Sequence, residues 1–188
     1  MTNPTPTTKV RGVRRMKKVE EAVKAMLDRE EIRELPARYC DLVWRNEIEA
    51  LVKLFTPDGE FVMVTPTQTY TARGHKELLD FYVRGLAMTP RPFIHNMVVE
   101  LGKKGHAVGR CYLELRSAKR DMAWLGTGHY LDHYEKHKGS WKFARREFTA
   151  LRMEDLPAEA TTPIPAKAKP KPKPKAAPRA RKPRVSEA

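Results

Sequence analysis

The spacing of apolar residues changes once along this 188-residue chain, and that change limits the folds open to it. Up to residue 55, apolar side chains recur every three or four residues, which is typical of amphipathic helices. From residue 60 onward, most segments alternate apolar and polar residues, which is typical of strands with one buried face. Helices followed by long strands predict an α+β fold in which one sheet packs against the helices.

The first part of the chain is predicted to be helical. An amphipathic helix is expected over residues 19–27, and Asp28 with Glu31 has the pattern of a capping box, so a second helix is expected to begin there. Pro36 is expected to kink this second helix because proline removes one backbone hydrogen bond.

Asn46 is expected to cap a further helix over residues 48–55, which would end at the turn Thr-Pro-Asp-Gly. One more helix is predicted at residues 74–87. The strands are predicted at residues 60–64, 69–72, 93–101, 107–116, 123–136 and 141–151. We expect these strands to form an antiparallel or mixed sheet, curled into a cone around the helices and open at one end to a small molecule.

The net charge of +14 is concentrated at the two ends of the chain. Residues 1–18 carry +6 and residues 157–188 carry +7, which leaves about +1 for residues 19–156. Both ends also contain prolines and few apolar residues, so they cannot bury enough surface to offset the entropy lost on ordering. We therefore predict a folded domain over residues 19–156, a disordered basic arm over residues 1–18 and a disordered Pro/Lys/Ala-rich tail over residues 157–188.

The basic ends suggest one class of partner. Lysine-rich chains attract nucleic acids and other polyanions by releasing counterions. The tail has no aromatic residue, so it could sense charge but could not stack on bases. The alternative is that the tail is a solubilising extension without a fixed partner.

Several classes of protein are excluded by composition. No apolar run reaches the roughly 18 residues that a membrane span needs, and we expect a soluble cytoplasmic protein. The two cysteines are too few for a disulfide framework or a zinc site. His129, His133 and His137 share one face of a predicted strand, but strand residues four apart are separated by about 13 Å, too far to bind one ion. We therefore predict no metal site.

Five segments together resemble the SnoaL-like branch of the nuclear transport factor 2-like (NTF2-like) superfamily, which includes scytalone dehydratases, ketosteroid isomerases and polyketide cyclases. They are, in chain order, IRELPARYCDLVWRNEIEALVKLF, TPDGEF, ARGHKELLDFY, PRPFIHNMVVEL and GTGHYLDHYEKHKGSWKFARREF. The resemblance covers roughly residues 28–152. It implies a cone with an apolar pocket, a homodimer formed through the open sheet face, and proton chemistry that needs no cofactor.

The resemblance also implies a catalytic Asp–His pair, and this sequence departs from it. Where the family has the Asp, five residues after Tyr39, this chain has Trp44, and where the family has the His it has Pro92. Asp41 and His95 are the candidates to replace the pair. His95 would face inward only if a one-residue bulge followed Pro92.

The remaining candidate residues each have a functional and a structural interpretation. Tyr39 is either an assisting acid or a core residue, and Trp44 and Pro92 either line the pocket or fill it. Asn96 and Arg146 match family positions, where they either face the pocket or make structural contacts. Asp41 and His95 are more ordinary as a solvated helix residue and a packed strand residue.

Two hypotheses on function follow. The first is a small-molecule-binding protein with a hydrophobic pocket, or a cofactor-free lyase or isomerase of the dehydratase type that acts on a ring-shaped substrate. The second is a non-catalytic binding or scaffold module whose basic ends contact nucleic acid or another polyanion.

Overall fold

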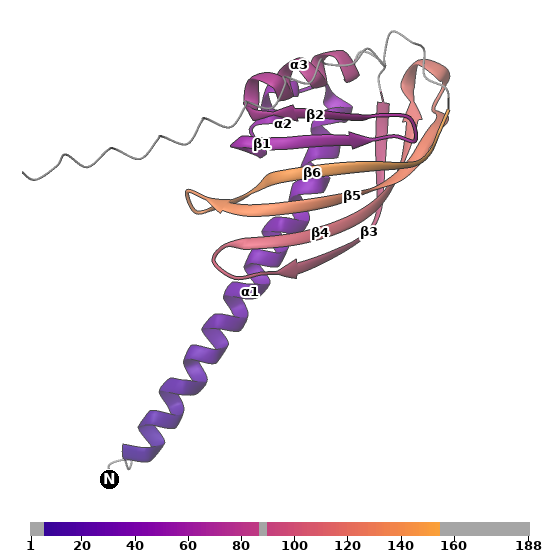
Figure 1. Cartoon of the computed structure of the whole chain (residues 1–188). Helices are drawn as coiled ribbons and strands as arrows, with labels where there is room; N and C mark the ends of the chain where they lie inside the picture. Colours follow the sequence, from indigo (N-terminus) through magenta and orange to yellow (C-terminus); the bar gives the residue numbers. More distant parts are fainter. Residues whose placement is uncertain (1–5, 87–89, 155–188) are drawn as a thin grey trace, which may run out of the picture.

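The computed structural model describes residues 6–86 and 90–154 and shows six strands in one curved sheet with helices against one face (Figure 1). The strand order is β2-β1-β6-β5-β4-β3. β1 and β6 are parallel, and the other neighbours are antiparallel. The elements are α1 (Pro6–Arg45), α2 (Ile48–Val52), β1 (Phe55–Val64), β2 (Thr69–Arg73), α3 (Gly74–Leu86), β3 (Pro90–Leu101), β4 (His106–Ser117), η1 (Ala118–Arg120), β5 (Ala123–His137) and β6 (Ser140–Met153).

The predicted α+β fold with a curved, mixed sheet is confirmed. Register shifts interrupt four of the five strand pairings, and such bulges bend a strand and increase its twist. The core lies between the concave face of the sheet and helices α1 and α3. No helix within the described residues is long and apolar enough to cross a membrane.

Helix α1 is one uninterrupted helix of 40 residues, where the sequence predicted two helices and a disordered arm up to residue 18. It begins at Pro6, which suits the first helical position because its missing N–H has no partner there in any case. It continues through Asp28 and through Pro36, whose side chain is fully buried. Its N-terminal half projects beyond the sheet (Figure 1).

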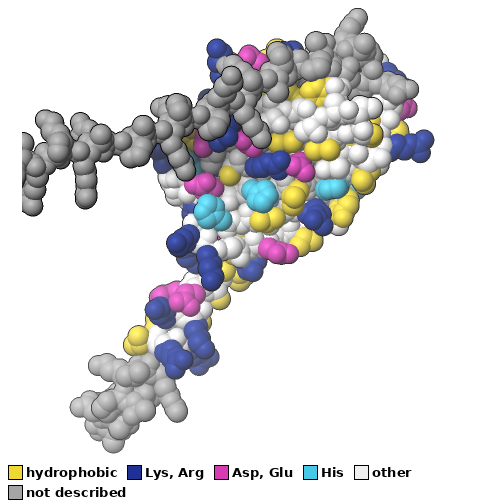
Figure 2. Space-filling view, in the orientation of Figure 1, with side chains coloured by type: hydrophobic (Ala, Val, Ile, Leu, Met, Phe, Trp, Pro, Cys, Tyr) yellow, Lys and Arg dark blue, Asp and Glu magenta, His cyan; other side chains and the backbone are white. Residues whose placement is uncertain are grey.

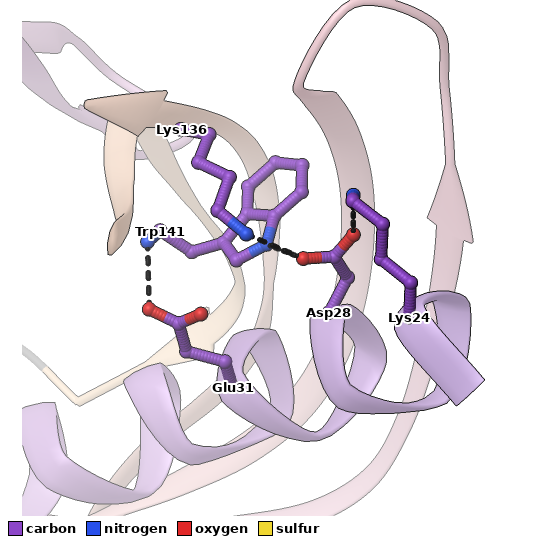
Figure 3. Close-up of polar contacts among 5 residues, drawn as sticks. All are labelled: Lys24, Asp28, Glu31, Lys136 and Trp141. Atoms are coloured by element: carbon purple, nitrogen blue, oxygen red, sulfur yellow. Dashed lines mark hydrogen bonds and ion pairs between the residues drawn. The ribbon is translucent and has the colours of Figure 1, made fainter. Parts of the chain in front are cut away.

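Asp28 and Glu31 do not cap a helix but attach α1 to the β5–β6 hairpin (Figure 3). Asp28 accepts hydrogen bonds from Lys136 Nζ at 2.7 Å and from Trp141 Nε1 at 2.9 Å. Its other oxygen accepts from Lys24 Nζ at 2.8 Å. Glu31 Oε1 accepts from the backbone N–H of Trp141 at 2.8 Å. Burial raises the pKa of Asp28, but hydrogen bonds from Lys136, Lys24 and Trp141 outweigh it and hold this pKa well below the usual range.

Asn46 ends α1 instead of beginning α2. Its φ of 59° is left-handed, a conformation that Asn tolerates better than most residues. Its N–H donates to the carbonyl of Val43, and the N–H of Glu47 donates to the carbonyl of Leu42. These two bonds form a Schellman motif. The N-cap of α2 is Glu47, whose side chain makes no capping hydrogen bond.

The turn predicted at residues 56–59 lies inside β1. Strand β1 begins at Phe55, and its pairing with β6 shifts register between Phe55 and Glu60. The turn-forming residues are therefore an irregularity within a strand. Helix α2 is correspondingly shorter than the predicted helix over residues 48–55.

Candidate functional site

A charged pair is buried in the concave interior of the sheet. Asp132 on β5 and Arg146 on β6 are both 0% exposed, and Arg146 Nε lies 3.5 Å from Asp132 Oδ1. The two residues are register partners in the β5–β6 ladder, so their side chains leave the same face of the sheet. Tyr134 Oη donates a hydrogen bond of 2.9 Å to the second carboxylate oxygen, Oδ2. We call Asp132 and Arg146 the buried pair.

Aromatic rings surround the guanidinium of Arg146. Its Cζ lies 3.6 Å from the ring centroid of Tyr130, 4.2 Å from that of Tyr39 and 4.6 Å from that of Phe143. These three rings form the aromatic cage, and their faces attract the cation. Tyr39 reaches the cage from α1, and its hydroxyl donates to that of Tyr82 on α3 at 3.2 Å. Helices and sheet therefore both contribute to the site.

Three atoms of the buried pair have no hydrogen-bond partner among the described residues: Arg146 Nε, Arg146 Nη1 and Asp132 Oδ1. Arg146 Nη2 has only the Cys111 sulfur, at 3.9 Å. Nearly all buried polar groups in proteins are hydrogen-bonded, and leaving one without a partner costs roughly 1–3 kcal/mol. The interior thus presents two donor atoms, both on Arg146, and one acceptor atom, on Asp132. A carbonyl oxygen could accept from the donors, and a hydroxyl group could donate to the acceptor.

Burial shifts the pKa values at this site. Burial raises the pKa of Asp132 to about 6, against the opposing effect of Arg146 and the Tyr134 hydroxyl. Arg146 remains charged, because the effect of burial on its pKa is outweighed by the Asp132 carboxylate. Burial raises the pKa of Tyr39 and of Cys40 to about 12 and that of Cys111 to about 11. Asp132 is therefore a buried carboxyl group with a pKa of about 6, paired with the arginine that the aromatic cage surrounds.

The structure brings together two of the residues predicted from the sequence and leaves the proposed catalytic pair apart. Tyr39 and Arg146 meet in the interior. Asp41 is exposed on α1 and forms an ion pair with Arg45 at 3.4 Å. His95 is exposed on β3. No hydrogen bond or ion pair joins Asp41 to His95 within the described residues, so the expected replacement pair is not formed.

The reason lies in the position of the bulge on β3. Ile94 pairs with Leu113 and Met97 pairs with Cys111, so β3 has one extra residue between them. Ile94 and Met97 are both partly buried against the core, and the two residues between them, His95 and Asn96, are both exposed. The bulge exists, but it follows Ile94 instead of Pro92 and turns Met97 inward. Asn96 consequently does not face the interior.

Trp44 and Pro92 contact each other at the junction between α1 and the start of β3. Trp44 Nε1 donates a hydrogen bond of 3.0 Å to the carbonyl of Pro92. The indole packs edge-on against Phe93, at 5.3 Å between ring centroids, and lies 5.5 Å from the Arg91 guanidinium. Pro92 is buried, whereas Trp44 is 40% exposed. Trp44 thus covers the beginning of β3 and does not fill the interior.

Sequence reasoning missed Asp132, although a signal for it was present. The segment Tyr-Leu-Asp-His-Tyr at residues 130–134 alternates, so Tyr130, Asp132 and Tyr134 share one face of β5. All three are buried, while His133 is exposed on the other face. An acid between two aromatic residues on the buried face of a strand was the available indication.

A separate groove of about 510 Å³ lies at the surface near α2 and α3. Its lining includes Glu47, Ile48, Lys53, Leu79 and Val83. It contains no member of the buried pair or of the aromatic cage, so it is a different place from the interior site.

Comparisons with known proteins agree with this architecture. The family model described as the SnoaL-like domain matches residues 24–147. An NTF2-like protein with a cystatin-like fold from Novosphingobium aromaticivorans is 22% identical, with a TM-score of 0.63, covering 78% of this chain and 96% of that one. No match was found among curated protein sequences.

Two further solved structures have the same fold. A protein assigned as a scytalone dehydratase from Novosphingobium aromaticivorans is 20% identical, with a TM-score of 0.61 over 79% of this chain and 99% of that one. LinA is 18% identical, with a TM-score of 0.62 over 72% of this chain and 93% of that one. At these identities the structures establish the fold alone, whereas the family model covers well over half of the chain. The chain belongs to the SnoaL-like domain family.

Proposed function

We propose that the interior of the cone binds a small ring-shaped molecule that carries both a hydroxyl group and a carbonyl or carboxylate oxygen. The observation that supports this is the set of unpartnered polar atoms on the buried pair. Arg146 Nε and Nη1 would donate to the carbonyl or carboxylate oxygen, and Asp132 Oδ1 would accept from the hydroxyl.

The aromatic cage supports a ring-shaped ligand. Faces of Tyr39 and Tyr130 lie against the guanidinium, and a planar ring is the shape that stacks on such faces. Because these side chains pack closely in the core, a ligand has to displace some of them on entry. We expect binding to be accompanied by a change in the environment of the tyrosine rings.

The second candidate is cofactor-free proton transfer, as in a lyase or isomerase, with Asp132 as the base. Its pKa of about 6 and its Oδ1, which accepts no hydrogen bond, favour this role, since a base is most effective when its pKa lies near the working pH. In this proposal Asp132, and not His95, removes the substrate proton. Arg146 would stabilise the negative charge that develops on the neighbouring oxygen.

Calorimetric titration with salicylate, benzoate and toluene tests the binding proposal. We expect salicylate to bind most tightly, because it alone among the three supplies both polar groups. The variant for the test is Arg146→Met with Asp132→Leu, since replacing a whole buried pair with apolar residues is often neutral for stability. It should weaken salicylate binding by about tenfold or more, given roughly 1.5–3 kcal/mol for hydrogen bonds to charged groups.

The control is His95→Ala, which changes an exposed residue outside the site and should bind salicylate like the wild-type chain. Equal affinity of the wild-type and doubly substituted chains for salicylate would contradict the proposal, as would tighter binding of toluene than of salicylate. For the catalytic candidate, Asp132→Asn should abolish turnover of a bound substrate while His95→Ala retains it.

We also propose a homodimer formed through the outer face of the sheet. Val98 on β3, Val108 and Tyr112 on β4 and Leu151 on β6 are exposed, and contiguous exposed apolar side chains mark association surfaces. Substituting Val98 and Val108 with Glu should reduce the mass measured by light scattering, whereas substituting the exposed Lys103 with Glu should not. An unchanged mass in the Val98/Val108 variant would rule out this interface.

Contact with nucleic acid or another polyanion is the alternative function, and it concerns residues 157–188, which lie outside the described residues. The sequence there carries +7, which supports attraction to polyanions. Removing residues 157–188 should lower retention on immobilised DNA at low salt. If retention is unchanged, the tail does not act in this way.

A further inference from the structure

The projecting part of α1 carries an apolar stripe that is largely exposed to solvent. Met16, Val19, Val23 and Met26 are between 48% and 68% exposed, and Leu27 at the edge of the stripe is 66% exposed. Figure 1 shows this part of α1 extending away from the sheet, and Figure 2 shows hydrophobic and basic side chains together on it. Large apolar side chains gathered on one solvated helix face indicate a surface that is covered by a partner.

The stripe faces away from the described part of the domain. At 100° per residue, its four residues lie on the side of α1 roughly opposite to the side that α1 buries in the core. The buried side carries Ile32, Leu35, Tyr39 and Val43. Continued toward the C-terminus, the stripe side carries the exposed Glu30, Glu34 and Asp41. The apolar surface is therefore confined to the part of α1 beyond the cone.

The spacing within the stripe identifies the kind of partner. Residues 16, 19, 23 and 26 are separated by three, four and three positions, which is the a and d spacing of a coiled-coil seam. The same spacing is obtained when the stripe is read backwards. A second identical helix running antiparallel therefore places Met16 against Met26 of the other copy, and Val19 against Val23 of the other copy. The stripe is complementary to itself across a two-fold axis near residue 21.

Charge selects the antiparallel arrangement over the parallel one. Arg14, Arg15, Lys17 and Lys18 form a basic group at the start of the stripe. In a parallel pair the basic groups of both helices would adjoin and repel each other. In the antiparallel pair the two basic groups lie at opposite ends of the paired stripes, roughly 15 Å apart along the axis, so their repulsion is weaker.

We propose that two copies of this protein associate through antiparallel pairing of the α1 stripes, residues 16–26, with their cones at opposite ends of the paired helices. This contact is separate from the outer sheet face, which lies on the strands. The two contacts together would join dimers into larger assemblies, and either one can exist without the other.

Cross-linking of the full chain tests the direction of pairing. Met16→Cys and Met26→Cys chains are prepared separately, and each is treated with a short bismaleimide alone and after mixing. We expect a cross-linked pair mainly in the mixture. Cross-linking of each variant with itself, equal to that in the mixture, would indicate a parallel pair and overturn the proposal. The unsubstituted chain gives the background from Cys40 and Cys111, which are half-buried and buried.

Sedimentation equilibrium tests whether the stripe holds the copies together. Val19→Glu with Val23→Glu should raise the dissociation constant by about tenfold or more, because unpaired charges would enter the seam. Lys103→Gln with Lys104→Gln makes the same change in net charge in the exposed turn between β3 and β4 and should leave association intact. Circular dichroism checks that α1 stays helical in both variants.

Two results contradict the proposal. One is equal association of the seam variant and the wild-type chain. The other is a wild-type chain that does not associate through the stripe but binds vesicles of anionic phospholipid, with the seam variant losing that binding. That second result would make α1 a membrane-surface helix.

Discussion

Substituting Asp28 with Ala should destabilise the protein by about 2–3 kcal/mol. The indole N–H of Trp141, a buried residue, would lose the Asp28 acceptor that lies 2.9 Å away, and an unpartnered buried donor costs roughly 1–3 kcal/mol. The ion pair with Lys136, whose side chain is 29% exposed, adds about 0.5–1 kcal/mol. Lys24 is 72% exposed, and its pair with Asp28 contributes little.

The matched control is Asp28→Asn, which keeps an oxygen that can accept from Trp141 and removes only the charge. Its loss of stability should be about 1 kcal/mol. Urea unfolding followed by far-UV circular dichroism gives the free energy of unfolding of each variant. The reasoning is refuted if Asp28→Ala costs less than about 0.5 kcal/mol, the ordinary range of surface substitutions, or if the two variants lose stability equally.

The pH dependence provides a second check on Asp28. Its pKa in the folded protein is lower than its ordinary value of 3.8, so the unfolded chain binds the proton more readily. The stabilisation is therefore fully present well above pH 3.8 and is lost as the pH falls below that value toward the folded pKa. Asp28→Asn should remove this part of the acid sensitivity.

Three further predictions concern the interior and the backbone. The pKa of Asp132 is raised from 3.8 to about 6 in the folded protein. The free energy of unfolding should therefore fall by about 3 kcal/mol as the pH rises from below 4 to above 6. Asp132→Leu with Arg146→Met should abolish that dependence in urea unfolding across pH. Asn46→Ala should cost about 1 kcal/mol because of its left-handed φ, whereas Asn46→Gly should be nearly neutral by the same assay. Gly128→Ala should lower the melting temperature, because a Cβ there would lie 2.3 Å from a backbone oxygen; Gly85→Ala meets nothing within 4 Å and should leave it unchanged or raise it.

Local patterns identified most elements but misplaced the boundaries of the N-terminal helices. Asp28 and Glu31 have the spacing of a capping box, yet both point at the β5–β6 hairpin. Asn46 favours a helix terminus, and it forms the end of α1 instead of the start of α2. These residue types favour helix ends in general. Which end they form, or whether they contact another element, depends on what the fold brings near them.

The interior site was only partly predictable. Resemblance to the family indicated Tyr39 and Arg146, and the two do meet in the interior. Asp132 was not predicted as a site residue, and its pairing with Arg146 follows from the register of β5 and β6. His95 is exposed on β3, because the one extra residue follows Ile94 and turns Met97 inward.

The sequence by itself determined the α+β class, the resemblance to the SnoaL-like family and the concentration of charge at the two ends of the chain. Those properties depend on hydrophobic period and composition, which are local. The tertiary structure decided that α1 is one helix, that Asp132 and Arg146 form the charged pair, and that the apolar stripe at residues 16–26 is exposed beyond the sheet. Each of these depends on strand register and packing between distant residues, which no local pattern records.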